Sequence, residues 1–216
     1  RMAEESPVTR PFHILTVCTM NICRSPALEV SFENATSSCE ALPLGSVVVA
    51  SAGTHAVPGA TSCDISLAHV GRASREQRSR QLTGISLAEA DLVIVAERKH
   101  AHAVTDVSSD FASRCFTARE AARLSSWVAS EMTPAAELSA LPARPADRLR
   151  WLVDQMDVAR ATAPQPTPTN LPYGVEDIPD PHVLGFNLHE MSAQMIIAAV
   201  DEMVAAAAKV LSTTPE

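Results

Sequence analysis

A cysteine and an arginine with five residues between them stand near the start of the chain, in Cys18-Thr-Met-Asn-Ile-Cys-Arg24-Ser25-Pro26. A short apolar run, 13–17, precedes this stretch, and Ser25-Pro26 offers a helix N-cap followed by an N1 proline. A helix that begins just after a parallel strand points its amide N–H groups and its positive dipole end at the connecting loop, which suits a phosphate group. These groups and Arg24 would favour a thiolate at Cys18 and make it a nucleophile at neutral pH. The planar guanidinium of Arg24 can hold two oxygens of a phosphoryl group.

Cleavage of a phosphate monoester also requires a proton for the leaving group. The segment Asp177-Ile-Pro-Asp-Pro181 carries two candidate acids, Asp177 and Asp180. An aspartate before a proline is also a common turn residue, so a purely structural role is the alternative for Asp180.

Short apolar segments alternate with helical patterns along the chain. Strands are predicted at 13–17, 47–51, 92–96 and 114–116. Helices are predicted at 25–36 and 147–160, with capping boxes starting at Ser86 and Thr117 and a final helix starting at Asn187. Strands that alternate with helices predict an α/β fold whose parallel sheet has helices on both faces. We interpret the stripe on the last helix as core, with a cofactor or partner groove as the alternative; it comprises Leu188, Met191, Met195, Ala199, Met203 and Val210.

The 216 residues suffice for one domain. Residues 1–10 are predicted to be a flexible N-terminal tail, and 11–216 a single domain. An insertion rich in alanine, proline and threonine is expected at about 129–174, with the helix at 147–160 docked on the core.

Composition and charge exclude several function classes. The chain has 17 Lys and Arg against 25 Asp and Glu, a net charge of −8, which argues against nucleic-acid binding. It has no apolar run long enough for a membrane span and no apolar centre for a signal peptide near its start. Five irregularly placed cysteines do not indicate a disulfide framework, so we expect free thiols and a cytoplasmic protein. With no Cys-x2-Cys pair, and His100 and His102 as the close histidines, no metal or cofactor is predicted.

The stretch Val17-Cys-Thr-Met-Asn-Ile-Cys-Arg-Ser-Pro-Ala-Leu-Glu29 resembles the phosphate loop of the low-molecular-weight protein tyrosine phosphatases. Further segments resemble that family in the same order, at 51–54, 78–82, 91–95 and 177–181. The resemblance covers about 12–128 and 175–211 and leaves the alanine- and proline-rich insertion outside it. It implies the family's flavodoxin-like fold, a three-layer sandwich around a short parallel sheet of about four strands.

The resemblance also implies roles for individual residues. Cys18 would attack phosphorus, and Asp180, which precedes the matching proline, would protonate the leaving oxygen and then activate water. Ser25 would stabilise the departing thiolate, and Asn21, Ser25 and Ser51 would support the loop. The phosphate would be held by Thr19, Met20, Asn21, Ile22, Cys23, Arg24 and Ser25. The implied activity is metal-independent hydrolysis of phosphate monoesters through a phosphocysteine. Its substrate would be a phosphorylated protein, with phosphotyrosine favoured, or a small aryl phosphate.

Three departures from the family pattern leave the substrate open. Met20 stands where the family usually has glycine, Gln77 where it has histidine, and His182-Val183 where it has an aromatic wall. A loop of converging amides commonly needs a residue with positive φ, so we expect Met20 to strain the loop by roughly 1 to 2 kcal/mol. The alternative is that its thioether lines the mouth of the pocket.

Two other functions fit the same loop. A weak or inactive phosphate-binding interaction protein would keep the fold without turnover. An arsenate reductase would need further cysteines to relay a disulfide, and Cys39, Cys63 and Cys115 are widely separated along the chain. Within the loop, Cys23 is predicted to form a reversible disulfide with Cys18 under peroxide, with a merely buried thiol as the alternative.

Overall fold

The computed structural model describes residues 10–71, 76–131, 141–185 and 188–213. Its sheet has four parallel strands, as predicted, and their order is β2, β1, β3, β4. The strands are β1 (Phe12–Cys18), β2 (Val47–Gly53), β3 (Leu92–Val95) and β4 (Cys115–Thr117). Pairing of Cys18 with Gly53 and of Val17 with Val95 places the carboxyl ends of three strands side by side.

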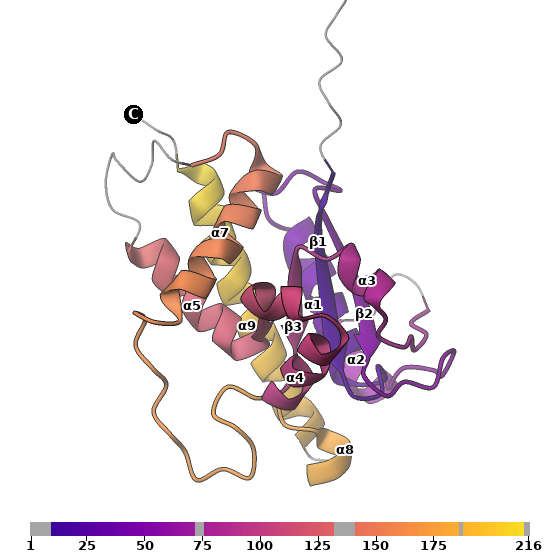
Figure 1. The fold of residues 1–216 in the computed structure, drawn as a ribbon. Coiled ribbons are helices and arrows are strands. Elements are labelled where there is room, and N and C mark those ends of the chain that lie inside the picture. The colour runs from indigo at the N-terminus through magenta and orange to yellow at the C-terminus, as the bar shows by residue number, and fades with distance from the viewer. Residues whose placement is uncertain (1–9, 72–75, 132–140, 186–187, 214–216) are drawn as a thin grey trace, which may run out of the picture.

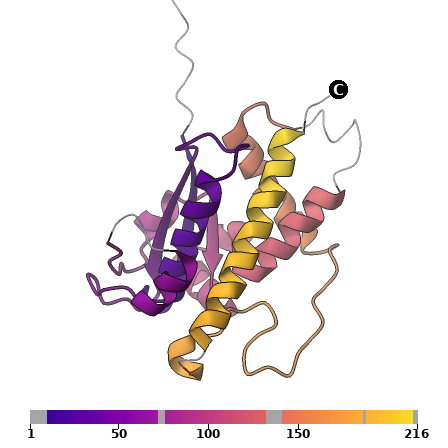
Figure 2. The same cartoon turned by 180° about the vertical axis from the view of Figure 1, so that it is seen from behind.

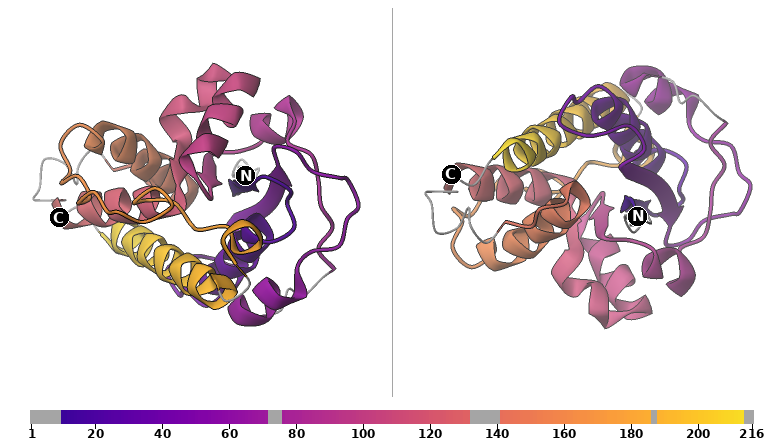
Figure 3. Two further views of the ribbon diagram at one scale, coloured as in Figure 1. Left: turned by 90° about the horizontal axis from the view of Figure 1, so that it is seen from below. Right: turned by 90° about the horizontal axis from the view of Figure 1, so that it is seen from above.

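Helices cover both faces of the sheet, which makes the three layers visible when the molecule is viewed along the strands (Figure 3). The first face packs against α1 (Arg24–Ser37), α5 (Ala118–Glu131) and α9 (Leu188–Ser212), with α2 (Asp64–Val70) and α7 (Pro145–Ala159) at their sides. The second face packs against α3 (Gly84–Ala88), α4 (Arg98–Val107) and the 3-10 helix η1 (Ser109–Arg114). This is the flavodoxin-like arrangement predicted from the sequence.

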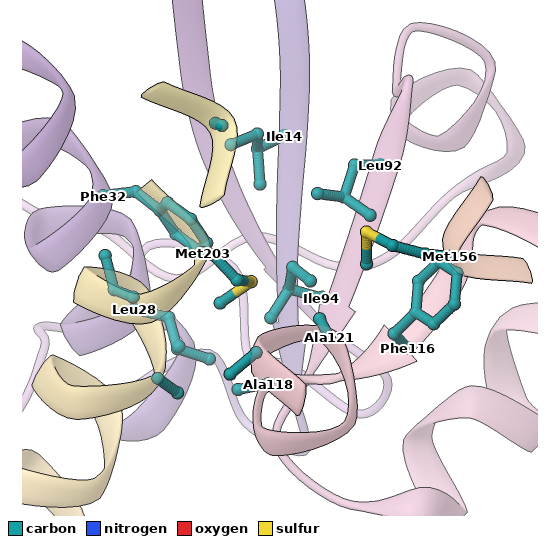
Figure 4. Packing of buried hydrophobic residues seen from close by; sticks show 14 of the residues in the cluster. Ile14, Leu28, Phe32, Leu92, Ile94, Phe116, Ala118, Ala121, Met156 and Met203 are labelled. Atoms are coloured by element: carbon teal, nitrogen blue, oxygen red, sulfur yellow. The ribbon is translucent and has the colours of Figure 1, made fainter. Parts of the chain in front are cut away.

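Alternate strand residues divide the core between the two faces. Ile14, Ile94 and Phe116 point to the first face, where they meet Leu28 of α1 and Met203 of α9 (Figure 4). Leu15, Val17, Val93 and Val95 pack on the second face. Burial of β1 and β3 on both faces explains why these strands are continuous apolar runs rather than alternating ones.

The helix at 147–160 lies close to its predicted position. It runs from Pro145 to Ala159, with the proline in its first turn, and its apolar side is buried in the main core. Parts of the predicted tail (1–9) and of the predicted insertion (132–140) lie outside the described residues. Arg10, the last residue of the predicted tail, is bound to the sheet through Asp91, with a distance of 2.5 Å between Nη2 and Oδ1.

Two predicted capping boxes have different outcomes. The Thr117 box is confirmed, because the Thr117 hydroxyl accepts from the Glu120 amide and the Glu120 carboxylate accepts from the Thr117 amide. The box predicted at Ser86 is wrong. Thr83 caps α3 and Ser86 is its reciprocal partner, so the helix begins earlier than predicted.

Helix α9 spans the length of the molecule (Figure 2) and its methionine stripe is only partly core. Ala199, Met203 and Val210 are buried as predicted. The rest of the buried face is rotated from the predicted stripe, because residues such as Ile196 and Val200 are buried while Met191 and Met195 are only half-buried. The predicted cap at Asn187 lies outside the described residues. Among the described helices, none combines the length and apolarity required to cross a membrane.

Candidate active site

The Cys18 loop lies at the carboxyl end of β1, and α1 begins directly after it. Cys18 is the last residue of β1, and α1 starts at Arg24, one residue before the predicted N-cap. Backbone hydrogen bonds fix the loop to its neighbours: Thr54 N–H donates to the Cys18 carbonyl at 2.9 Å, and His55 N–H donates to the Thr19 carbonyl at 2.8 Å. Cys23 occupies the N-cap without a side-chain cap hydrogen bond, so no side chain at that position competes for the first amides of α1.

Gly53, at the end of β2, allows the loop backbone to approach the sheet. A Cβ atom on this residue would lie 2.6 Å from the Thr19 carbonyl oxygen and 2.7 Å from the Asn21 nitrogen, closer than real side-chain carbons come. Sequence reasoning placed Gly53 in a family-like segment but did not identify this packing role. The available signal was a glycine directly after a buried strand.

The positive φ of the loop is at Asn21, at 53°, and not at Met20, so the expectation of a strained methionine is wrong. Asparagine tolerates this conformation better than most residues, because its short side chain can bond locally. Here its Nδ2 donates to Ser25 Oγ at 2.9 Å, and its Oδ1 accepts from Arg80 N–H at 2.8 Å. The Met20 side chain is 38% exposed.

The Ser25 hydroxyl connects the nucleophile candidate to this brace. Cys18 Sγ and Ser25 Oγ lie 3.0 Å apart, and Ser25 Oγ also lies 3.2 Å from the Ala52 carbonyl. Because Asn21 donates to the Ser25 oxygen, the single Ser25 proton points either to the Ala52 carbonyl or to the sulfur. A hydroxyl donated to sulfur stabilises the thiolate form.

Ser51 differs from the expectation that it supports the loop. Its hydroxyl donates to the buried carboxylate of Glu29, with Oγ and Oε2 2.5 Å apart. This bond joins β2 to α1, so Ser51 supports the helix that carries the loop and not the loop itself.

Arg24 is almost completely buried, at 2% exposure, and is paired with two carboxylates. Its Nη1 donates to Glu97 and, at 3.0 Å, to the Ile178 carbonyl, and its Nη2 donates to Asp180 Oδ2 at 2.6 Å. Lys99 also pairs with Glu97, at 2.8 Å from Oε2. Burial alone would raise the pKa of Glu97, but hydrogen bonds from Arg24 and Lys99 outweigh burial and lower it below its usual value. Sequence reasoning missed Glu97, whose signal is an acid just beyond a strand end.

The segment with the two candidate acids is anchored on both sides. Ile178 N–H donates to the Ala96 carbonyl at 2.8 Å, just beyond the end of β3. The Ser192 hydroxyl of α9 donates to the Pro179 carbonyl at 2.8 Å. The short helix α8 (Pro181–Leu184) follows at the carboxyl end of the strands (Figure 1). These bonds bring Asp180 to the loop from a distant part of the sequence.

The two aspartates of this segment do different things. Asp177 accepts from the backbone amides of Arg98, at 2.8 Å, and Gly174, at 3.2 Å, so its carboxylate is occupied in turn and helix capping. Asp180 also caps a helix, because its Oδ1 accepts from His182 N–H at 3.0 Å. However, the other oxygen of Asp180 reaches the buried guanidinium of the loop, and this contact favours Asp180 as the acid.

His100 lies behind the loop and was not identified from the sequence. Its Nδ1 accepts from Glu97 N–H at 3.1 Å, which assigns the proton to Nε2, and Nε2 donates to Thr19 Oγ1 at 2.9 Å. Burial, followed by the positive charge of Arg24, lowers the pKa of His100 to about 4. A neutral His100 therefore orients the Thr19 hydroxyl at neutral pH.

Cys23 is a buried thiol at the back of the loop. Its sulfur lies 2.6 Å from Ser66 Oγ, and burial raises its pKa to about 12. Cys23 is therefore protonated at neutral pH and is a poor nucleophile.

Comparisons with known proteins agree with this geometry. The family model for the low molecular weight phosphotyrosine protein phosphatase matches residues 13–136. No curated protein matches the chain. The YwlE arginine phosphatase from Geobacillus stearothermophilus is 20% identical, with a TM-score of 0.56 over 90% of this chain and 92% of that one. Wzb of Vibrio vulnificus in complex with benzylphosphonate is 19% identical, with a TM-score of 0.56 over 91% and 99% of the two chains.

A third solved structure is a cysteine-to-serine mutant of YwlE arginine phosphatase with a phosphorylated active-site serine. It is 18% identical, with a TM-score of 0.58 over 90% of this chain and 94% of that one. At these identities the solved structures establish the shared fold. The family model spans more than half of the 216 residues and includes the whole Cys18 loop. The chain therefore belongs to the low molecular weight phosphotyrosine protein phosphatases, hydrolases that use a cysteine nucleophile.

Proposed function

We propose that Cys18, Arg24 and Asp180 catalyse hydrolysis of phosphate monoesters on phosphorylated proteins, with phosphotyrosine as the substrate residue. The observation that carries this proposal is the convergence of the three side chains from two distant segments. Cys18 sulfur lies against a hydroxyl donor, and Arg24 joins the loop to Asp180 at 2.6 Å. No metal or cofactor is required by this set of groups.

In the first step the Cys18 thiolate attacks phosphorus, forming a sulfur–phosphorus bond as the ester phosphorus–oxygen bond breaks. The leaving oxygen takes the proton of Asp180. In the second step Asp180, now a carboxylate, takes a proton from water as the water attacks the phosphocysteine. The thiolate leaves with the Ser25 hydroxyl donating to it, and the enzyme returns to its starting state.

The phosphate would be held by the amides of 19–25 and by the Arg24 guanidinium. Before substrate binds, Asp180 and Glu97 occupy that guanidinium. A phosphate oxygen would displace the Asp180 carboxylate from Nη2, and Asp180 would then take up from solvent the proton that it donates to the leaving oxygen. Glu97, with its lowered pKa, would stay ionised and keep the fork oriented.

Support for an aryl substrate comes from the acid segment and from a relative. His182 and Val183 follow Asp180 after one proline and both are exposed, so an aromatic ring of a substrate could pack on them. Benzylphosphonate, which the Vibrio vulnificus Wzb structure contains, carries an aromatic ring on a phosphonate. The five cysteines are free, and a reducing cytoplasmic compartment would keep Cys18 as a thiol.

Turnover of para-nitrophenyl phosphate, a phosphotyrosine peptide and a phosphoarginine peptide by the wild-type protein tests the substrate. The phosphoarginine arm is included because YwlE is an arginine phosphatase. We expect the phosphotyrosine peptide to give the higher kcat/KM, and a preference for phosphoarginine would refute the proposed substrate.

The role of Asp180 is tested against Asp177, a matched aspartate three residues away. Asp180→Asn should lower kcat by about 10²- to 10⁴-fold, the usual contribution of a general acid. Asp177→Asn should chiefly lower stability, because it weakens the capping of two backbone amides. A larger loss of kcat in Asp177→Asn would exchange the two roles.

A further inference from the structure

Two cysteines and two histidines converge beside the phosphate loop. Cys23 comes from the loop, Cys63 from the N-cap of α2, His182 from α8 and His189 from the first turn of α9. Their sulfur and ring nitrogen atoms all lie within 4.8 Å of one another. Cys63 Sγ is 3.6 Å from His189 Nε2, and the two imidazole rings meet edge to face with their centroids 4.9 Å apart.

We propose that these four side chains form a Zn²⁺ site that links the phosphate loop to the acid segment. Two thiolates and two imidazoles are a ligand set that zinc prefers, and the set lacks the oxygen ligands that calcium and magnesium require. Tetrahedral zinc with these ligands has ligand-to-ligand distances of about 3.3 to 3.8 Å. The Cys63–His189 pair is already within that range, and the other pairs need to close by at most about 1.5 Å.

The backbone already holds the segments that carry the ligands. Cys63 N–H donates to the Ile22 carbonyl at 2.8 Å, which fixes the start of α2 to the loop next to Cys23. The bond from the Ser192 hydroxyl to the Pro179 carbonyl fixes the acid segment to α9, which carries His189. Little backbone reorganisation is therefore needed to bind the ion.

Burial and charge also suit zinc. Cys23 and His189 are buried, Cys63 is half-buried and His182 is exposed, so an ion can enter beside His182. Each cysteine releases its proton to solvent on binding, and each histidine binds through an unprotonated nitrogen. Zn²⁺ with two thiolates is neutral overall, which limits the desolvation penalty of placing the ion in a partly buried site.

Occupation of this site would lower turnover. His182 N–H donates to Asp180 Oδ1, and Cys23 immediately precedes Arg24, so the ion would clamp both sides of the Arg24–Asp180 ion pair. Phosphate would then have to separate Asp180 from Arg24 while the bound ion holds both segments in place. This consequence rests on the proposed function, whereas the metal site itself does not.

The site is tested by titrating the reduced, metal-free protein with Co²⁺, which reports tetrahedral thiolate coordination by visible d–d bands and a thiolate-to-cobalt charge-transfer band. We expect one Co²⁺ per chain, displaced by Zn²⁺. Cys63→Ser and His182→Ala should each weaken binding by at least about tenfold, and Cys63→Ser should also weaken the charge-transfer band. Cys39→Ser and His69→Ala, matched changes outside the cluster, should bind as the wild type does.

The Cys18→Ser variant tests whether the metal binds at the four proposed ligands or at the nucleophile Cys18. We expect it to keep the cobalt spectrum, and its loss would place the ion at Cys18 and overturn the proposal. Absence of tetrahedral bands in the wild type, or unchanged affinity in both Cys63→Ser and His182→Ala, would also overturn it.

The activity arm compares Zn²⁺ inhibition of wild type and Cys63→Ser. Cys63→Ser should keep the basal rate and lose inhibition at the zinc concentration that saturates the wild-type site. If zinc binds at the four ligands while no form of the protein hydrolyses phosphate esters, the proposed function fails and the metal site stands. If the wild type is active and saturating zinc leaves its rate unchanged, the regulatory consequence is refuted.

Discussion

His100 makes the stability of this protein depend on pH in a way that can be calculated from its surroundings. The imidazole is buried, with one nitrogen accepting from the Glu97 amide and the other donating to the Thr19 hydroxyl. A second proton has no acceptor in this arrangement and would sit beside the Arg24 charge. Burial and Arg24 consequently lower the pKa of His100 to about 4, from 6.5 in an exposed histidine.

Because this pKa is lower in the folded state, the unfolded chain takes up the proton first as the pH falls. The stability contribution is therefore fully present above about pH 6.5 and is lost as the pH falls towards 4. A difference of about 2.5 pKa units corresponds to about 3 kcal/mol, of which about 2 kcal/mol is lost by pH 5.

Urea unfolding of wild type, His100→Gln and His102→Gln at pH 7 and pH 5 measures this loss. The other titrating groups are common to all three proteins and cancel in the comparison. His102 is exposed and serves as the matched control. Between the two pH values, wild type and His102→Gln should lose about 2 kcal/mol more than His100→Gln does. If the free energy of unfolding had the same pH dependence in all three proteins, the conclusion that His100 is buried and neutral would be refuted.

Three further changes test the loop. Arg24→Lys should be nearly as damaging as Arg24→Ala in steady-state kinetics, because a point charge cannot reproduce the planar fork, and equal rates for lysine and arginine would contradict this. Met20→Gly should lower the free energy of unfolding by about 0.5 to 1 kcal/mol in urea titrations. Glycine adds backbone entropy to the unfolded chain, and at Met20 there is no positive φ for it to relieve. A gain in stability would show that the loop is strained at this residue. Peroxide should leave Cys18 and Cys23 unlinked, because the buried and protonated Cys23 thiol is a poor nucleophile toward an oxidised Cys18, and a Cys18–Cys23 disulfide found by mass spectrometry would contradict this.

The sequence predicted the parts of the site that are adjacent along the chain. The strand, the loop and the helix start around Cys18 are encoded locally, by an apolar run, a polar loop and Ser25-Pro26. The choice of Asp180 over Asp177 required the resemblance to a family, because both are acids in the same turn-rich segment. Their different hydrogen-bond partners become visible only in the folded structure.

Other features could not be read from local patterns because they depend on contacts between distant segments. Glu97 and His100 look like surface residues at a helix start, yet the sheet brings them behind the loop. The position with positive φ is Asn21, one residue beyond the expected Met20, because the backbone turns where hydrogen bonds to Ser25 and Arg80 support it.

The Cys–His cluster and the face of α9 show the same limit. The four ligands are spread between residues 23 and 189, so no metal-binding spacing is visible in the sequence. In α9, alanine, methionine and isoleucine occur on several sides of the helix. The hydrophobic pattern alone therefore does not determine which side of the helix is buried. Packing against α1 and α5 determines which side is buried.

The central claim is that Cys18 carries the phosphoryl group during turnover. It is tested by mixing the Asp180→Asn variant with para-nitrophenyl phosphate, quenching in acid and mapping the phosphorylated peptide by mass spectrometry, with Cys18→Ala as the control. Our account predicts a phosphate on Cys18, none in the Cys18→Ala control, and turnover abolished in Cys18→Ser while oxyanion binding is retained. Phosphate on another residue, or substantial metal-independent turnover by Cys18→Ser, would contradict it.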